Sequence, residues 1–166
     1  MKKQAPDAID LLDADHLAVH GLVHSYRELV RVHASALQRR SLAEEICLEL
    51  TIHAKVEEEL FYPAVREALQ DDELLDEAED QHGSLRELVG QVLATAPEDP
   101  LYDARVSVLA DYVERHVRQE REQVFNRVLA ARMDLHSLGR AIAARKEELR
   151  AVSEALREDA LAAALA

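Results

Sequence analysis

Apolar residues recur near the start of the chain at alternating steps of three and four residues, the spacing of one face of an α-helix. We therefore predict a helix over residues 7–35, with this face directed into a protein core. One position on the face is a histidine, although histidine is polar. The face consists of Ile9, Leu12, His16, Val19, Val23, Tyr26 and Val30.

A second helical face follows the polar stretch HASALQRRS and predicts a helix over residues 42–69. Ser41 and Glu44 have the spacing of a capping box, which marks the start of this helix. Pro63 lacks a backbone N–H, so it should kink the helix or end its first part. The face consists of Leu42, Ile46, Leu50, His53, Glu57, Leu60 and Ala64.

Two further faces predict helices over residues 73–95 and 101–131, and a fifth helix should follow Asp134 over about residues 135–160. The connecting segments are short enough to join antiparallel neighbours. We therefore predict an all-α fold, an up-down-up-down four-helix bundle over about residues 7–131 with an additional C-terminal helix. The apolar face of the fifth helix is thin, so this helix should lie across the bundle or reach toward a partner.

Composition supports this fold class and narrows the range of partners. One domain over residues 1–166 suits the length, and 48% hydrophobic with only 4% aromatic residues favours helix over strand. A formal net charge of −13 argues against nucleic acid, and the lack of a long apolar run argues against a membrane. The single cysteine, Cys47, excludes an internal disulfide and suggests a reducing compartment. We therefore expect a cytoplasmic protein.

Polar side chains on the apolar faces carry the chemistry of this sequence. Two of the helices repeat one pattern, a histidine followed four residues later by a glutamate (HAKVE and HVRQE), which places both side chains on one face. Burying such groups without partners costs several kcal/mol, and a metal cluster would satisfy all of them together. Imidazoles and carboxylates suit iron, manganese or zinc, and a carboxylate can bridge two metals about 3.5–4 Å apart. The predicted ligands are His16, His53, Glu57, His82, His116 and Glu120.

The segments around these residues resemble a known family. DADHLAVH, LTIHAKVEEELFYPAV, EDQHGSLREL and ERHVRQEREQVF follow the order of the haemerythrin-like, HHE cation-binding family over about residues 10 to 130. A ferritin-like site would instead need two ExxH turns, and the chain has one, at Glu79–His82. The resemblance implies two non-haem iron ions with an oxo or hydroxo bridge, and Glu57 and Glu120 as bridging carboxylates. It assigns the terminal histidines in pairs, His16 with His53 on one iron and His82 with His116 on the other.

One position departs from the oxygen-carrying members of the family. Those proteins place a second histidine one turn after the ligand of the third helix, where this chain has Arg86. A guanidinium cannot coordinate a metal, so the second iron should have one histidine fewer. We expect Arg86 either to pair with Glu58 or Glu79, or to cover the open position. This departure argues against simple reversible oxygen transport.

Two other expectations depend on the predicted layout. In a simple hairpin, His16 and His53 would differ in height by roughly 10 Å at 1.5 Å per residue. An earlier end of the first helix, near His33, would remove this mismatch. His20 should lie at the surface or around the site, and Tyr62 should pack in the core, although its hydroxyl could reach the site.

The favoured function is a di-iron protein that handles a small diatomic ligand or peroxide. Sensing or storing oxygen, binding nitric oxide and breaking down peroxide all need an open position on redox-active iron, and residue spacing does not separate them. An alternative is a non-catalytic iron-binding, stress-response or sensing module whose cluster stabilises the bundle. A third reading is a metal-free helical interaction domain. The sequence leaves open whether the protein is an enzyme and which protein partner it has.

Overall fold

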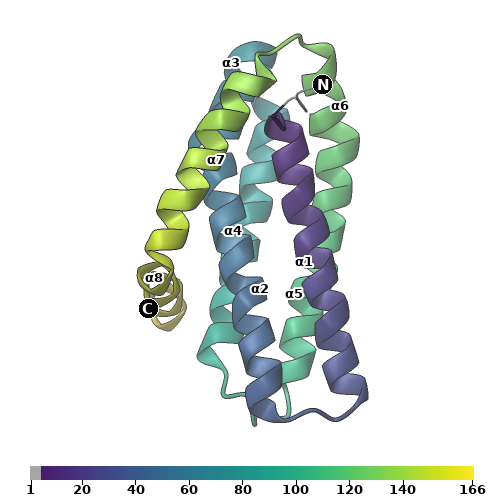
Figure 1. The fold of residues 1–166 in the computed structure, drawn as a ribbon, viewed down its shortest axis with the longest axis vertical. Coiled ribbons are helices and arrows are strands. Elements are labelled where there is room, and N and C mark those ends of the chain that lie inside the picture. Colours follow the sequence, from purple (N-terminus) through teal and green to yellow (C-terminus); the bar gives the residue numbers. More distant parts are fainter. Residues whose placement is uncertain (1–4) are drawn as a thin grey trace.

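The structure is a computed structural model that describes residues 5–166, and every regular element in this range is helical. Four helical rods lie side by side, and consecutive rods run antiparallel (Figure 1). The prediction of an all-α fold is confirmed. The rods are α1 (Ala8–Arg31); α2 (Ala36–Val56) continued by η1 (Glu57–Phe61) and α3 (Tyr62–Leu69); α4 (Asp72–Ala94); and α5 (Tyr102–Gln119) continued by η2 (Glu120–Phe125) and α6 (Asn126–Ala130).

The turn between the first two rods differs from the prediction. α1 ends at Arg31 rather than at residue 35, and α2 begins at Ala36 rather than at residue 42. Ser35 Oγ accepts a hydrogen bond from the Gln38 N–H at 3.2 Å, and Gln38 Oε1 accepts one from the Ser35 N–H at 3.1 Å. The predicted capping box at 41–44 is wrong, because this earlier box starts the helix and leaves residues 41–44 inside it.

The earlier turn also removes the predicted mismatch in height. His33 has a positive φ of 53°, which ends the helical path shortly after α1. With these bounds, His16 and His53 lie at similar distances along the chain from the turn that joins α1 to α2. The two side chains therefore lie at the same level of the bundle.

Two rods contain a π-helical segment, and each segment begins at the glutamate of the repeated His–Glu pattern. η1 begins at Glu57 and η2 at Glu120, and each ends at a phenylalanine. The two rings, Phe61 and Phe125, pack edge to face with centroids 5.8 Å apart. Pro63 follows η1 in the first turn of α3, so the first part of the helix does end near it. η2 contains no proline, which shows that proline is not needed for the wider turn.

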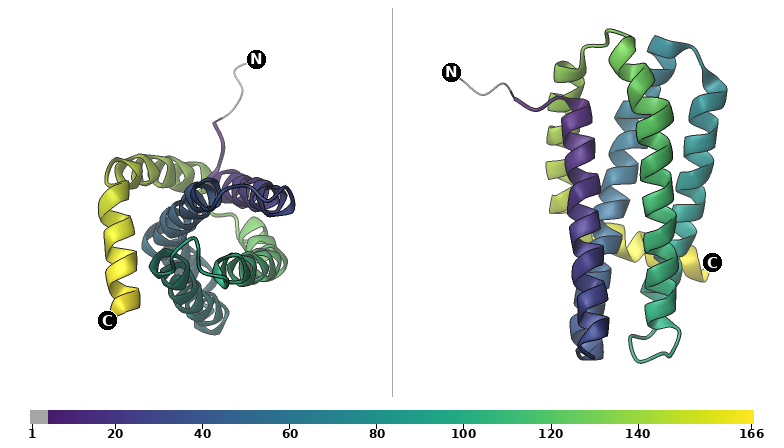
Figure 2. Two further views of the ribbon diagram at one scale, coloured as in Figure 1. Left: turned by 90° about the horizontal axis from the view of Figure 1, so that it is seen from below. Right: turned by 90° about the vertical axis from the view of Figure 1, so that its right-hand side faces the viewer.

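The C-terminal segment forms two helices rather than the single helix predicted over residues 135–160. α7 (Leu135–Ala151) packs alongside α1 and α2, and α8 (Ser153–Leu165) packs on α4 and α2. The two helices meet at Val152, where α8 turns and runs across the rods (Figure 2). The prediction that the C-terminal helix lies across the bundle therefore holds for α8, whereas α7 runs along the rods.

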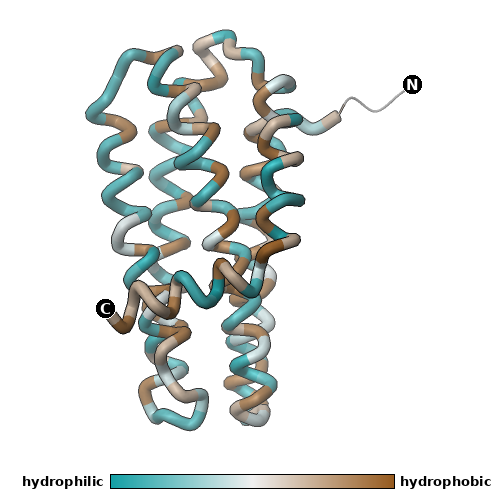
Figure 3. Tube along the Cα trace, turned by 90° about the vertical axis from the view of Figure 1, so that its left-hand side faces the viewer, coloured by the Kyte–Doolittle hydropathy of each residue, from teal (hydrophilic) through white to brown (hydrophobic). Residues whose placement is uncertain are grey.

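Hydrophobic and hydrophilic positions alternate along every rod, as expected of amphipathic helices (Figure 3). The buried apolar residues form two clusters. One is near the α1–α2 turn and includes Val23, Leu50 and Leu109, and the other, near the start of α1, includes Leu12 and Phe61. The polar residues described below lie between them. Within residues 5–166, no helix is long and apolar enough to cross a membrane.

Candidate metal centre

The structure brings all six predicted ligand residues together in the middle of the bundle. Each rod contributes at least one of them, and every one of the six side chains is buried. Their ligand atoms form two groups, each lying within 4.8 Å, and Glu57 belongs to both. One group consists of His16, His53, Glu57 and Glu120, and the other of Glu57, His82 and His116.

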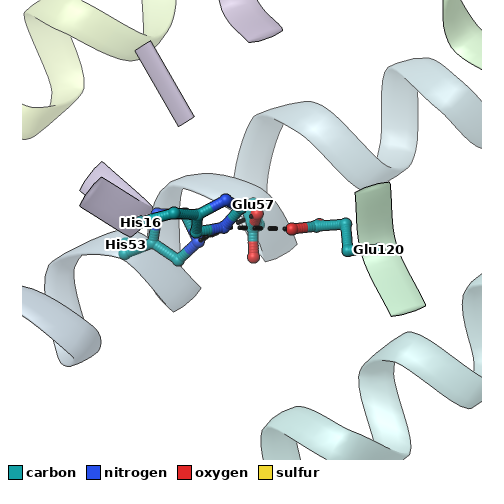
Figure 4. Close-up of side chains that lie close together, drawn as sticks. All are labelled: His16, His53, Glu57 and Glu120. Atoms are coloured by element: carbon teal, nitrogen blue, oxygen red, sulfur yellow. Dashed lines mark hydrogen bonds and ion pairs between the residues drawn. The ribbon is translucent and has the colours of Figure 1, made fainter. Parts of the chain in front are cut away.

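The first group contains two imidazoles whose Nε2 atoms face each other (Figure 4). His16 Nε2 lies 3.1 Å from His53 Nε2. Carboxylate oxygens approach the same two nitrogens, with Glu57 Oε1 at 3.1 Å from His53 Nε2 and Glu120 Oε2 at 3.2 Å from His16 Nε2. Four potential ligand atoms therefore surround one point.

The second group has the same construction with one carboxylate fewer. His82 Nε2 lies 3.3 Å from His116 Nε2. The second oxygen of Glu57, Oε2, lies 3.0 Å from His82 Nε2. Glu57 thus directs one oxygen to each group, which is the arrangement of a carboxylate that bridges two metal ions.

Each of the four histidines has an acceptor for its outer ring nitrogen, Nδ1. Metal-binding histidines in proteins commonly donate this hydrogen bond, which fixes the ring and leaves the Nε2 lone pair free. Here all four rings direct Nε2 to the centre. The partners of Nδ1 are Asp13 for His16 at 3.4 Å, Asp15 for His53 at 3.1 Å, Glu58 for His82 at 3.0 Å and Gln81 for His116 at 2.6 Å.

The donor set fits divalent metal ions. When each histidine is neutral and carries its proton on Nδ1, the buried oxygens Glu57 Oε1 and Glu120 Oε2 have no hydrogen-bond donor within the described chain. Two nitrogen ligands about 2.1 Å from one ion and at right angles would be about 3 Å apart, as the facing nitrogens are in both groups. Burying such oxygens unpaired is costly, and a cation between the ligands removes that cost.

The pKa values show that three groups of the centre hold their protons more strongly than usual and that one, His116, holds its proton less strongly. Burial lowers the pKa of His53, but Glu57 and Asp15 outweigh it and raise that pKa to about 10. Burial is likewise outweighed at His82, whose pKa rises to about 9 beside Glu57 and a neighbouring glutamate. Burial raises the pKa of Glu120 to about 7 and lowers that of His116 to about 3. Without metal, the centre therefore holds protons where metal cations would replace them.

Tyr62 belongs to the site, although the sequence favoured core packing for it. Its ring is fully buried, and its hydroxyl lies 3.1 Å from Glu120 Oε1, 3.3 Å from Glu57 Oε2 and 3.2 Å from His82 Nε2. Burial, together with the two carboxylates, raises its pKa, so the hydroxyl keeps its proton. Residues five apart do not share a face of an α-helix, but the wider π turn of η1 brings Tyr62 round to Glu57.

The remaining predicted neighbours lie outside the two groups. Arg86 forms an ion pair with Glu58 and is 61% exposed, so it swings aside rather than covering the second group. Glu79, the other predicted partner, pairs with Arg66. His20 is exposed, at the rim of a groove of about 580 Å³ between α1 and α5 that reaches His16.

The sequence of this chain matches that of a known protein family. A family profile described as "Hemerythrin HHE cation binding domain" matches residues 7–128. This chain belongs to that family. The HHE match begins just before α1 and ends within α6, at the end of the fourth rod, so α7 and α8 lie outside it.

Relatives of this HHE chain include proteins of similar length. The protein Rv2633c of Mycobacterium tuberculosis is 26% identical over 147 residues, which are 87% of this chain and 88% of that protein. A crystal structure of its homolog from Mycobacterium kansasii, a Hemerythrin HHE cation binding domain-containing protein, matches with a TM-score of 0.72. That match has 26% identity and covers 89% of each chain. A DNA nickase of Nostoc sp. is 38% identical over 81 residues, which are 49% of this chain and only 23% of the nickase.

Proposed function

We propose that this HHE protein is a non-haem di-iron protein that binds or reacts with oxygen, nitric oxide or peroxide. The observation that carries the proposal is the position of Glu57, whose two oxygens face two separate groups of histidines. Such a carboxylate suits a pair of metal ions, and iron supplies redox chemistry toward small ligands.

The two groups would give the two metals different numbers of protein ligands. His16, His53, Glu57 and Glu120 would hold the first ion, and Glu57, His82 and His116 the second. The second group offers one protein ligand fewer, because Glu120 belongs to the first group only. The Tyr62 hydroxyl, 3.2 Å from His82 Nε2, holds a proton beside this group. The second metal is therefore the one to which an added ligand should bind.

The size of the ligand follows from the burial of the centre. The six ligand residues are nearly inaccessible, and a space of only about 10 Å³ lies outside His116 and Glu120 between α4 and α5. The larger groove between α1 and α5 reaches His16 and has Val19 and Val113 in its walls. A diatomic molecule or peroxide is small enough to reach ligand atoms as buried as these, whereas a large organic molecule in the groove would remain outside them.

Metal content and optical spectrum test the metal centre directly. Protein purified in air should hold about two irons per chain and absorb in the near-ultraviolet, as bridged ferric pairs do. A His116→Ala variant should lose iron and much of this absorption, because His116 is half of the facing pair in the second group. His24→Ala, which removes an exposed histidine of α1, is the matched control and should change neither. A His116→Ala variant that kept two irons would overturn the assignment of this ligand.

Reaction with ligands separates the functional alternatives. Azide or nitric oxide should titrate one site per cluster, because only the second group lacks a protein ligand. Turnover of peroxide or nitric oxide would make the protein an enzyme. Binding without turnover would favour the sensing or iron-binding module. The ligand residues come from all four rods, so a change at the centre could be passed to each rod. Two equivalent ligand-binding irons would contradict the difference between the groups.

A further inference from the structure

A lysine from outside the family match contacts a residue that holds one of the proposed metal ligands. Lys146 lies on α7, beyond residues 7–128, and its ammonium forms an ion pair with Asp15 Oδ1. The other oxygen of Asp15, Oδ2, accepts a hydrogen bond from His53 Nδ1 at 3.1 Å. Both side chains of the ion pair are nearly buried, with exposed fractions of 13% and 10%. A chain of contacts therefore leads from the C-terminal segment to one of the proposed metal ligands.

The other ion pairs between the C-terminal segment and the bundle are of a different kind. They also join a cation on α7 or α8 to an acidic residue of the bundle, but each has at least one partner that is 28% exposed or more. None of these acidic residues contacts a histidine of the centre in the described chain. The pairs are Arg145–Glu59, Arg150–Glu49 and Arg157–Glu44.

The outer partners of the other histidines also differ from Asp15. Glu58 and Asp13 are paired with arginines that are 61% and 42% exposed and that belong to the four rods. His116 has the neutral amide of Gln81. A surface ion pair of this kind contributes little, whereas removing one partner of a buried pair leaves an uncompensated charge. Asp15 is thus the histidine partner that depends most on its cation.

We propose that Lys146 is a positioning residue of the metal centre, which fixes the Asp15 carboxylate and through it the ring of His53. Helix α7 thereby completes the site that the four rods begin. The inference rests on the proposed di-metal function for its consequence, whereas the contact itself is given directly by the structure. Without the ammonium, the Asp15 carboxylate would turn toward water, and His53 would lose the acceptor that orients its Nε2.

The test compares Lys146→Met with Arg150→Met, which removes a more exposed cation one turn later on the same helix. Two readouts are needed. The first is the exchange rate of the His53 Nδ1 proton, followed by NMR in the metal-free protein and in the zinc-loaded protein. The second is the affinity for zinc, measured by competition with a chelator.

We expect Lys146→Met to speed exchange of the His53 proton and to weaken zinc binding by roughly 10–100-fold, the usual effect of losing such a partner. Arg150→Met should leave both within about twofold of the wild type, since exposed pairs contribute little. Lys146→Arg should restore the protection of the proton, because it supplies a cation to the same carboxylate. Unchanged proton exchange in Lys146→Met, or equal losses in both methionine variants, would overturn the proposal.

A second variant covers the case in which Lys146→Met does not fold. Asp15→Leu has a side chain of similar size without acceptor oxygens, so it should expose the His53 proton to the same degree. Adding Lys146→Met to Asp15→Leu should then cause no further loss, because both changes break one chain of contacts. If the wild type bound no metal, the proposed function would fail, and proton exchange in the metal-free protein would still decide the role of Lys146.

Discussion

Tyr62 shows how much of the centre depends on residues that are not metal ligands. Its hydroxyl lies within hydrogen-bond distance of both carboxylates, Glu57 and Glu120, and it is the donor available to Glu120 Oε1. A buried carboxylate stabilised by a donor is worth more than a neutral hydrogen bond. The hydroxyl should therefore matter for both the stability and the electronic properties of the site.

Tyr62→Phe tests this role, and Tyr26→Phe is its control. Tyr26 is also buried and donates to a carboxylate, Asp103 at 2.6 Å, but it lies at the far end of the bundle. Each change should lower the free energy of unfolding by roughly 1.5–3 kcal/mol, measured by urea denaturation of the metal-free protein. Only Tyr62→Phe should also shift the charge-transfer absorption of the iron-loaded protein. An unshifted spectrum would place the hydroxyl outside the influence of the metals.

At this scale, the sequence predicted the inward-facing residues and missed their partners. The six candidate ligands were recognisable because each is polar on an otherwise apolar helical face. Asp15 and Gln81 were not, since their contacts are with histidines of neighbouring rods, and helical spacing describes one helix at a time. Tyr62 packs in the core as expected, but the contacts of its hydroxyl with the site depend on the π turn, which has no clear signal in the sequence.

At the scale of the elements, the positions of helix ends decide whether the site can form. Two sequences of capping-box type, at residues 35–38 and 41–44, compete to start α2, and the pattern alone does not rank them. The first one is used, which shortens the loop and brings His16 and His53 to one level. The residues around Val152 contain no glycine or proline, so the sequence carries no clear signal for the break between α7 and α8. The break there allows α8 to pack against α4.

Two glycines test the docking of α8 on α4. A Cβ added at Gly90 would lie 2.6 Å from the Cβ of Ala164, whereas one added at Gly21 would meet nothing within 4 Å. Gly21→Ala should stabilise the protein by up to about 1 kcal/mol, because alanine has the higher helix propensity. Gly90→Ala should destabilise it by roughly 1–3 kcal/mol through overpacking. If urea unfolding showed equal stabilisation by both changes, α8 would not pack on α4 in solution.

At the scale of the whole molecule, the bundle holds a charged centre between two apolar clusters. This arrangement costs stability when the metal is absent, because carboxylates and imidazoles share a buried space. Metal binding should therefore be coupled to stability, and the metal-free protein should melt at a lower temperature. Equal melting temperatures with and without metal would argue that the groups do not bind it.

The coupling should depend on pH, and the direction follows from the pKa values. His53 and His82 have pKa values of about 10 and 9 in the folded protein against 6.5 normally, so their protonation stabilises the metal-free fold. That contribution is full below pH 6.5 and is lost as the pH rises through about 9 and 10. Glu120, with a pKa of about 7 against 4.5, loses its contribution as the pH rises through about 7. His116, held at about 3, opposes these groups only below pH 6.5.

The metal-free protein should therefore melt at progressively lower temperature as the pH is raised from about 6.5 to about 9. Metal binding has the opposite dependence, because the imidazoles and carboxylates must lose their protons before they coordinate. The difference in melting temperature between metal-loaded and metal-free protein should widen over this range, and calorimetry at the two pH values measures it. His53→Ala removes one of the groups with a raised pKa, so the melting temperature of this metal-free variant should fall less steeply with pH. A difference that stayed constant with pH would mean that the protons and the metals do not compete for the same atoms.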